Sequence, residues 1–409
     1  MRTPELLFVS QTLPYPPDSG VNIRTFHILK ALAREFPTRV LAFWRRGAFE
    51  DASDVPGAAR TLEEEVGAPV SVFPIPMEWS LPAAGWVHAR SVIRGRPFTH
   101  YAHSVPLFFS SFSRVVAERE PRIVHLDSLD LSAGPEKIQE SGRCPKVVCT
   151  HHNVESALLG RRAEAETSLL KRAYLRRQAA LYAEEERRSC PAFDLNIAVS
   201  ERDAEDLRQA TGGRFTVIQN GVDLDFFRPD PGSQRAGVVF VGGGNWFPNR
   251  DALEFFCSEI LGAIREELPE MEVTWVGRCS QEDKETFWSR YRVRLTGYVE
   301  DVRPHLRRAT CLVVPLRVGG GTRLKVTTAW AAGIPVVGTS MGVEGLEGRD
   351  GEHFLVEDDP RGFAEAVVSL QRNPHLWRKL AEGGRRIAER SYGWGAIGRG
   401  LCERYRSLL

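Results

Sequence analysis

The chain has 409 residues, of which 42% are hydrophobic and 26% charged, and this composition is typical of a soluble globular protein with two or three domains. Its 54 basic and 53 acidic side chains nearly cancel, so no overall field favours nucleic acid as a partner. Seven scattered cysteines without CxxC pairs indicate reduced thiols, and the lack of a signal-peptide pattern or a long apolar run predicts a cytoplasmic protein.

Short apolar segments alternate with helical patterns through the first half of the chain. Residues 26–36, for example, have helical spacing and follow a loop rich in proline and glycine at 14–20. Alternation of this kind is typical of βαβ units and predicts a parallel sheet. The strands of this sheet are expected at 6–9, 40–43, 70–73, 123–126, 147–149 and 195–199.

Two stretches of the first half are less regular. Residues 74–112 carry many aromatic side chains among prolines and basic residues, and we expect most of them to pack against the first domain. The alternative is a surface that contacts a ligand or a membrane. Residues 161–188 are predicted to form a long helix, whose interleaved arginines and glutamates indicate a solvated face.

A second alternating series follows the turn signal Asn220-Gly221. Pro229 and Pro231 interrupt regular structure just beyond this turn, which places a domain joint here. The chain is therefore expected to form two doubly wound sheets in tandem. The strands of the second sheet are expected at 238–241, 273–276, 293–295, 311–314 and 335–337.

The most informative segment lies between the strand at 311–314 and a helical pattern that begins at Val326. Three glycines at 319–321 let the backbone approach a ligand closely, and the start of a helix adds partial positive charge. Arg323 and Lys325 add two full charges, so this loop is expected to bind an anion such as a nucleoside diphosphate. The alternative is an ordinary strand–loop–helix joint with solvated basic residues.

Taken in order, these motifs resemble those of GT-B glycosyltransferases of the large retaining family 4, also called glycosyl transferases group 1. The resemblance implies an α/β protein with two Rossmann-like doubly wound domains that face each other across a cleft. It implies an acceptor domain at 1–219, onto which a C-terminal helix at 391–409 folds back, and a nucleotide-sugar-binding domain at 220–390. The segments that carry it are 240–253, 319–325 and 331–339, with softer matches at 14–20, 151–156 and 220–223.

The resemblance assigns the catalytic histidine of the first domain to His152, which follows the expected strand at 147–149. A histidine at this edge can donate a hydrogen bond to a sugar hydroxyl or a phosphate and orient donor and acceptor. His151 takes this place if the register differs by one residue, and His125 is a weaker candidate after another strand.

The glycines after the strand at 238–241 are expected to pass close to the pyrophosphate, although a tight turn alone would also explain them. In the family, a segment such as that around Tyr298 borders the base, and Tyr298 could equally well pack within the domain. Thr322 could cap the following helix rather than bind. The expected donor-binding residues are Gly20, Gly242, Gly243, Gly244, Tyr298, Gly320, Gly321, Thr322, Arg323, Lys325 and Thr328.

The sequence departs from the family at several of these positions. Gly320 and Thr328 stand where many members carry two glutamates, the second of which binds the donor ribose. Gly243 and Asn249 replace the usual arginine and lysine of the first loop. Arg323 and Lys325 therefore remain the main expected cationic contacts.

The expected activity is that of a retaining, hexosyltransferase-like enzyme that moves a sugar from a nucleoside diphosphate sugar to a hydroxyl of a saccharide or lipid-linked acceptor. No metal or other cofactor is expected, and no nucleic acid partner. Envelope polysaccharide or glycoconjugate synthesis, at the inner face of the membrane through peripheral contact, is what the resemblance implies. Two alternatives remain: a non-catalytic GT-B protein that binds a nucleotide sugar, which Thr328 motivates, and a GT-B epimerase or hydrolase.

Overall fold

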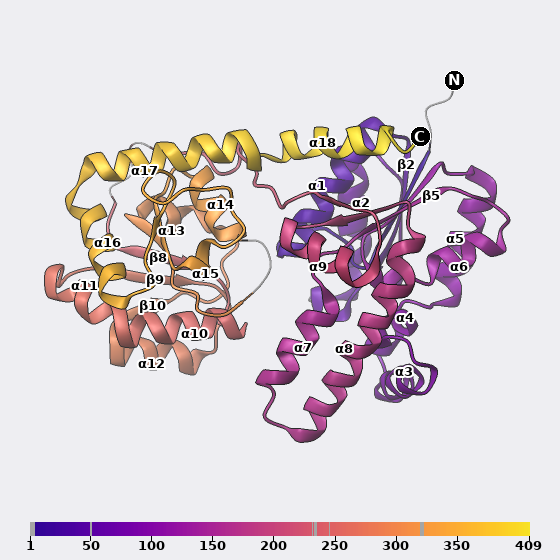
Figure 1. The fold of residues 1–409 in the computed structure, drawn as a ribbon, viewed down its shortest axis with the longest axis horizontal. Helices are drawn as coiled ribbons and strands as arrows, with labels where there is room; N and C mark the ends of the chain where they lie inside the picture. Colours follow the sequence, from indigo (N-terminus) through magenta and orange to yellow (C-terminus); the bar gives the residue numbers. More distant parts are fainter. Residues whose placement is uncertain (1–4, 50, 231, 233–234, 245, 320–322) are drawn as a thin grey trace. The chain divides into compact units, whose positions relative to one another are not determined.

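The computed structural model describes residues 5–409 except 50, 231, 233–234, 245 and 320–322. The chain divides into two compact units (Figure 1). Unit 1 comprises Met1–Gln219 and Gly398–Leu409, and unit 2 comprises Asn220–Ile397. Each unit is built on a parallel sheet with helices packed against it, which confirms the predicted α/β class with two Rossmann-like sheets.

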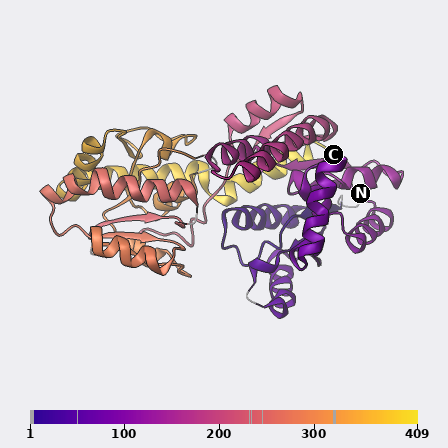
Figure 2. The ribbon, with the colours of Figure 1, turned by 90° about the horizontal axis from the view of Figure 1, so that it is seen from below.

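The sheet of unit 1 has the strand order β3-β2-β1-β4-β5-β6-β7, and every pairing is parallel. The chain moves outward from β1 to β3 and then returns to the other side of β1, so the strand order reverses between β1 and β4. Helices lie against both faces (Figure 2), which explains why all five residues of β1 are buried. The strands are β1 (Leu6–Ser10), β2 (Thr38–Trp44), β3 (Val70–Pro74), β4 (Ile123–Leu126), β5 (Lys146–Thr150), β6 (Leu195–Ala198) and β7 (Phe215–Val217).

The helices of unit 1 differ from the sequence expectations in one respect. The helix predicted over 161–188 is two helices, α7 and α8, which pack side by side (Figure 1). The aromatic residues at 74–112 do not all pack in the core as expected, because Phe112 is fully buried whereas Trp86 is 66% exposed. The helices are α1 (Gly20–Glu35), α2 (Val55–Val66), α3 (Leu81–Arg94), α4 (Phe98–Ala102), α5 (Pro106–Arg119), α6 (Gly134–Glu140), α7 (Glu155–Ala165), α8 (Leu169–Ser189) and α9 (Glu201–Thr211).

The sheet of unit 2 is also parallel and has the order β10-β9-β8-β11-β12-β13, with a reversal between β8 and β11. Its core contains Phe240 stacked on Trp275 with ring centroids 3.6 Å apart, and the fully buried Trp330. The strands are β8 (Val238–Val241), β9 (Val273–Val276), β10 (Val293–Leu295), β11 (Cys311–Val314), β12 (Val336–Gly338) and β13 (Leu355–Val356).

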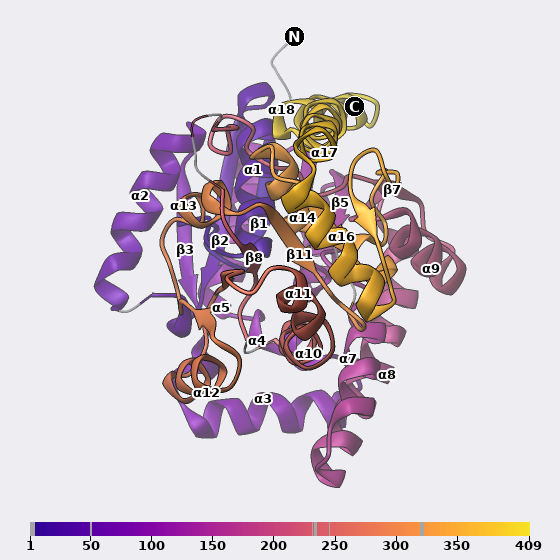
Figure 3. The same ribbon diagram turned by 90° about the vertical axis from the view of Figure 1, so that its left-hand side faces the viewer.

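The helices of unit 2 are α10 (Phe247–Phe255), α11 (Leu261–Glu267), α12 (Gln281–Tyr291), α13 (Arg303–Arg308), α14 (Leu324–Ala331), α15 (Ser340–Val343), α16 (Pro360–Arg372) and α17 (Pro374–Ile387). Several of them are seen end-on in Figure 3. Two π-helical turns, Phe256–Ile260 and Ala388–Tyr392, continue α10 and α17.

The last helix, α18 (Trp394–Arg406), begins in unit 2 and ends in unit 1. Its unit 1 part packs on α1, where a Cβ at Gly398 would lie only 2.8 Å from the Cβ of Ala31. Farther along, Arg406 pairs with Glu35 at the end of α1, and Tyr405 is buried. Among the helices formed by the described residues, none has the length and apolar character needed to cross a membrane.

Candidate functional site

Three neighbouring strands of unit 1 end in polar side chains. Ser10 is the last residue of β1, Asp127 follows β4 directly, and His152 lies two residues beyond β5. Because β1 pairs with β4 and β4 pairs with β5, all in parallel, these side chains emerge at one edge of the sheet. Open α/β sheets bind ligands at the carboxyl ends of strands beside a reversal of strand order, which makes this edge a candidate site.

Asp127 is the centre of this group, and it is a residue that the sequence analysis missed. Its side chain is fully buried, and Oδ2 accepts hydrogen bonds from Thr25 Oγ1 at 2.6 Å and Ser10 Oγ at 3.4 Å. Burial alone raises the pKa of this carboxyl, but the charge of His152 and the nearby ring nitrogens of His125 and His152 outweigh it and hold the pKa well below its usual range. Asp127 is therefore a carboxylate at neutral pH.

A buried cation lies beside this carboxylate. Arg24, in the second turn of α1, is 1% exposed. Burial lowers its pKa to about 10, and the negative charge of Asp127 opposes that shift. Both groups keep their charge at neutral pH, so the edge of unit 1 holds a buried pair of opposite charges. Gly20, one of the expected donor-binding residues, is the first residue of the same helix and is exposed.

His152 contacts Asp127 in two ways. Its Nε2 lies 2.8 Å from the backbone carbonyl oxygen of Asp127 and 3.4 Å from the carboxylate Oδ2. A carbonyl oxygen can only accept, so Nε2 carries the proton in this contact. The side chain is 7% exposed, so only a small part of the ring is accessible at this edge of the sheet.

The two alternative histidines are held inside unit 1. His151 is buried with Nε2 2.9 Å from Asn196 Oδ1, and burial lowers its pKa to about 4. His125 is buried within β4, stacks on Phe8 at 4.3 Å between ring centroids, and hydrogen-bonds through Nδ1 to the hydroxyl of Tyr405. His151 thus contacts a structural partner. His125 lies beside Asp127, with its Nε2 3.7 Å from Oδ1 of that carboxylate.

The glycines after β8 in unit 2 serve close packing within the unit. Gly242 N–H donates to Val276 O and Gly244 N–H to Arg278 O, both at 2.8 Å. A Cβ at Gly242 would lie 2.7 Å from the side-chain nitrogen of Asn249, so no larger residue fits. The N–H groups of Gly242 and Gly244 are thus paired within unit 2, and the expected close approach of this backbone to a pyrophosphate stays a prediction.

Asn249 connects this turn to the predicted cation Lys325. Its Nδ2 donates to Gly243 O at 3.0 Å, and its Oδ1 accepts from Lys325 Nζ at 2.9 Å. The ammonium also lies 3.8 Å from the centre of the Phe240 ring. Burial, followed by the charge of Arg323, lowers the pKa of Lys325 to about 7. Lys325 is therefore a cation whose charge depends on its surroundings near neutral pH.

Arg323 directly precedes α14 and is 5% exposed. Its Nε donates to Met341 O at 3.0 Å, and Nη2 lies 3.5 Å from Glu344 Oε2. Burial lowers the pKa of this guanidinium, and Glu344 opposes the shift. The predicted neighbours Gly320, Gly321 and Thr322 lie outside the described residues. Thr328, half-buried on α14, is one turn beyond Lys325 on the same helix.

Tyr298 is 56% exposed and lies under the guanidinium of Arg278, 4.9 Å from the ring centre. A bridge between Gly277 and Gly297 brings these two loops together at the ends of β9 and β10. Because Arg278 also accepts from Gly244, the tyrosine, the arginine and the glycine turn form one surface of unit 2. Arg278 follows a strand without a distinctive motif, so no sequence signal marks it.

Within the described part of the chain, no cluster of three or more histidine, cysteine or acidic side chains is arranged to hold a metal ion. Asp223 and Asp225 have an Asp-x-Asp spacing that the sequence analysis overlooked. Asp223 Oδ1 accepts the backbone N–H groups of Asp225 and Phe226, each at 2.9 Å, so this pair closes a turn.

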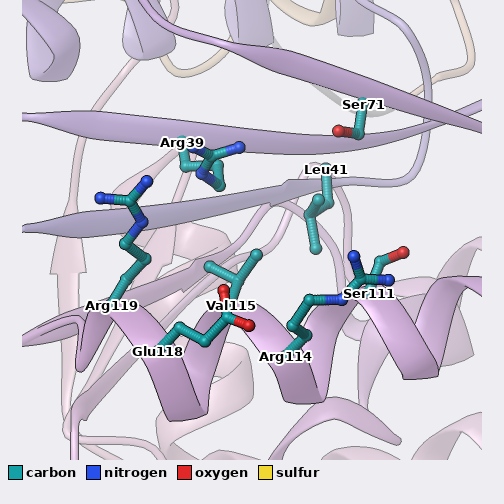
Figure 4. Close-up of a pocket in the computed structure, with 8 residues that line it drawn as sticks. All are labelled: Arg39, Leu41, Ser71, Ser111, Arg114, Val115, Glu118 and Arg119. Carbon is teal, nitrogen blue, oxygen red and sulfur yellow. The ribbon is translucent and has the colours of Figure 1, made fainter.

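A cavity of about 180 Å³ in unit 1 lies away from the candidate site (Figure 4). Its walls come from the amino-terminal halves of β2 and β3 and the carboxyl-terminal half of α5, whereas the Asp127 group lies at the carboxyl ends of the strands. The lining residues are Arg39, Leu41, Ser71, Ser111, Arg114, Val115, Glu118 and Arg119.

Comparison with known proteins matches both halves of the chain to families. The description Glycosyltransferase Family 4 applies to residues 18–226, and Glycosyl transferases group 1 applies to residues 235–373. Two curated relatives are D-inositol 3-phosphate glycosyltransferases, from Frankia alni and Catenulispora acidiphila, each 28% identical. The aligned regions are 50% and 52% of this chain and 56% of each relative, so the chain spans about half the length of these relatives.

Two solved structures share the fold over nearly the whole chain. Sucrose-phosphate synthase from Thermosynechococcus elongatus superposes with a TM-score of 0.69 at 17% identity, covering 99% of both chains. Anabaena Alr3699/HepE in complex with UDP and glucose superposes with a TM-score of 0.66 at 15% identity, covering 99% of this chain and 100% of the other. At these identities the likeness shows the fold alone.

Proposed function

The chain belongs to glycosyltransferase family 4 and has the GT-B fold, and from this premise we propose that it transfers a sugar, with retention of configuration, from a nucleoside diphosphate sugar to a hydroxyl acceptor. The observation that carries the proposal is Lys325, held by Asn249 beside the glycine turn of unit 2. Its lowered pKa shows a cation placed where protein groups do not fully stabilise its charge. An anionic ligand would supply that stabilisation.

The donor side of the proposal rests on unit 2. Lys325 and Arg323 would stabilise the charge that develops on the diphosphate leaving group, and each charge-assisted hydrogen bond contributes about 1.5–3 kcal/mol. Tyr298, which is exposed beside Arg278, would stack on a flat ring such as a base. Anabaena Alr3699/HepE, which has this fold, has been solved in complex with UDP and with UDP-glucose, and this supports a uridine nucleotide as the first donor to test.

The acceptor side rests on unit 1. His152, at the carboxyl end of β5, would orient the donor sugar and the acceptor hydroxyl. Asp127 is buried and hydrogen-bonded from two sides, so it is poorly suited to attack a sugar. This supports front-face departure and attack, in which no protein nucleophile is needed, and we propose that no metal is required.

We also propose that the acceptor is a saccharide or lipid-linked molecule used in envelope polysaccharide or glycoconjugate synthesis, and that the protein contacts the inner face of the membrane. The exposed apolar side chains of α3 support membrane contact, since Leu81 is 89% exposed and Ile93 is 76% exposed, with Trp86 between them. Binding to vesicles of anionic lipid, compared between the natural protein and Trp86→Ser, tests this part separately.

The test of the proposed activity measures release of nucleoside diphosphate from UDP-, GDP-, ADP- and dTDP-sugars with a panel of saccharide and lipid-linked acceptors. We expect release that depends on an acceptor, and a product whose anomeric configuration by NMR matches that of the donor. An inverted product would contradict retention. Turnover without any acceptor would instead indicate a hydrolase or an epimerase.

A second candidate is a protein that binds a nucleotide sugar without transferring it. Thr328 favours it, because a hydroxyl cannot replace the two-point contact that a carboxylate makes with a ribose diol. Donor binding without turnover across the whole panel would support this candidate and contradict the transferase. Thr328→Glu then becomes informative, since it would strengthen donor binding if the ribose lies beside this position.

A further inference from the structure

The orientation of His152 follows from which of its ring nitrogens is occupied. Nε2 lies 2.8 Å from the carbonyl oxygen of Asp127, and this oxygen can only accept a proton. Nδ1 has no hydrogen-bond partner among the described residues. In the neutral ring, therefore, Nε2 holds the proton and Nδ1 presents a lone pair. In the charged ring Nδ1 becomes a donor.

The carboxylate of the same residue lies within reach of the ring. Oδ2 is 3.4 Å from His152 Nε2, so Asp127 contacts one nitrogen with its backbone and its side chain together. The carbonyl thus determines the orientation of the ring, and the carboxylate adds a charged contact to the same nitrogen.

Asp127 is itself held from several elements. Thr25 of α1 donates to Oδ2 at 2.6 Å, and Ser10 of β1 donates to the same oxygen at 3.4 Å. On the other side, His125 Nε2 lies 3.7 Å from Oδ1, and its Nδ1 is bonded to Tyr405 of α18. A carboxylate fixed from α1, β1, β4 and α18 has little freedom to change its distance from His152.

We propose that Asp127 is a positioning residue for His152: its carbonyl oxygen holds Nε2–H, its carboxylate balances the ring charge, and the ring thereby offers Nδ1 to an oxygen of the donor or acceptor. This rests on the proposed function in so far as His152 contacts the substrates. The hydrogen-bond arrangement itself does not depend on the activity, so it can be tested without a substrate.

Asp127 contacts His152 as a carboxylate and interacts electrostatically with Arg24, while His125 and His151 are neutral because burial lowers their pKa values. Asp127→Asn removes the negative charge and keeps the carbonyl and the shape. The Nε2–H tautomer of His152 should therefore be kept, while its ring nitrogen shifts change because the charged contact is lost.

The first experiment uses the natural protein with 13C,15N-labelled histidine, and His152→Gln identifies the signals of His152. Ring nitrogen shifts distinguish the two neutral tautomers directly. We expect the Nε2–H form for His152. The Nδ1–H form, or a mixture of the two, would overturn the proposal whether or not the protein is a transferase.

The second experiment compares D127N with Asp194→Asn. Asp194 is a matched control, because it accepts from Val147 N–H of β5 at 2.8 Å and pairs with Lys146 without contacting His152. D127N should change the ring nitrogen shifts of His152 while keeping its tautomer, and it should lower kcat, because the ring loses its charged contact. D194N should leave the ring shifts and kcat in place. Unchanged ring nitrogen shifts of His152 in folded D127N would overturn the proposal.

A third variant protects against the case in which D127N does not fold. Thr25→Val removes the 2.6 Å hydrogen bond to Oδ2 and leaves more negative charge on the oxygen nearest His152. The ring nitrogen shifts of His152 should change while the Nε2–H tautomer is kept. Unchanged shifts would count against the role of the carboxylate. Loss of transfer activity with these NMR shifts intact would contradict the proposed function alone.

Discussion

The two units place polar groups at the same position of the same kind of sheet, yet they treat charge differently. In unit 1 the buried Asp127 is balanced by Arg24 and held by hydrogen bonds from α1 and β1. In unit 2 the ammonium of Lys325 contacts a neutral amide and an aromatic face, and the nearby charge of Arg323 disfavours its protonation. A carboxylate surrounded by cations and hydrogen-bond donors can hold a neighbouring side chain in one orientation. A cation whose charge the protein only partly stabilises can bind an anion.

The largest expected difference between the units is their response to acid. His100 and His151 of unit 1 are buried, and burial, their largest cause, lowers both pKa values to about 4. Above pH 6.5 these rings are neutral in the folded and unfolded chain. As the pH falls from about 6.5 to about 4, only the unfolded chain gains protons, so stability falls by up to roughly 3 kcal/mol for each ring.

In unit 2 burial also lowers the pKa values of His305 and His353, but by less. Unit 1 should therefore lose its hydrogen-exchange protection at a higher pH than unit 2 during acid titration. Mass spectrometry of peptides from each unit measures this directly. Simultaneous loss of protection, or earlier loss in unit 2, would contradict the assignment of neutral buried histidines to unit 1.

His152→Ala tests the orienting site. Removing a preorganised hydrogen-bonding group from an active site commonly lowers kcat by about 10²–10³, and we expect that loss with a KM for the donor sugar that changes little. His151→Ala is the matched control. It should lower the melting temperature, because a buried hydrogen bond is lost, and keep the activity of the folded fraction. Equal effects of the two changes on kcat would show that the wrong histidine had been chosen.

Lys325→Met tests the anion site. It keeps the length and apolar contacts of the side chain and removes the charge, so UDP affinity should fall roughly tenfold to 150-fold. Arg323→Ala should lower UDP affinity by a similar factor. Lys379→Met is the control, since Lys379 is exposed on α17. Calorimetric titration with UDP measures all three. If Lys325→Met leaves the UDP affinity unchanged, Lys325 does not contribute to the anion site.

The smallest expected effect is the pH dependence of UDP affinity. The pKa of Lys325 is about 7 in the ligand-free protein, so the ammonium predominates below pH 7 and is lost above it. A bound anion stabilises the charged form, so affinity should decline by about tenfold from pH 6 to pH 9, with proton uptake on binding near pH 7. Lys325→Arg should abolish this dependence, because arginine stays charged. A flat profile in the natural protein would contradict the lowered pKa.

The alternation of apolar segments identified both sheets from the sequence, because strands with both faces buried read as continuous apolar runs. The segment at 123–126, for example, coincides with β4. The short strands β7 and β13 were missed, since their residues are only half-buried and lack such a run. The single helix predicted over 161–188 is wrong, because the charged pattern continues through the loop between α7 and α8 and does not mark where one helix ends.

The candidate site was predictable only where a local motif marks it. His152, Arg323 and Lys325 each lie in a motif, whereas Asp127 and Arg278 follow strands without one. The glycines at 242–244 were expected to approach a phosphate, and only the structure shows that the amides of Gly242 and Gly244 bond to Val276 of β9 and to Arg278 just beyond it.

The sequence by itself determined where the buried strands of both sheets form, because burial periodicity acts over a few residues. Only the tertiary structure decided the partners of Asp127, since Thr25 lies 102 positions away and His125 is joined to Tyr405 across 280 positions. The protonation of these groups depends on burial and on the charges that folding brings within a few ångströms. Neither quantity is encoded in the spacing of residues along the chain.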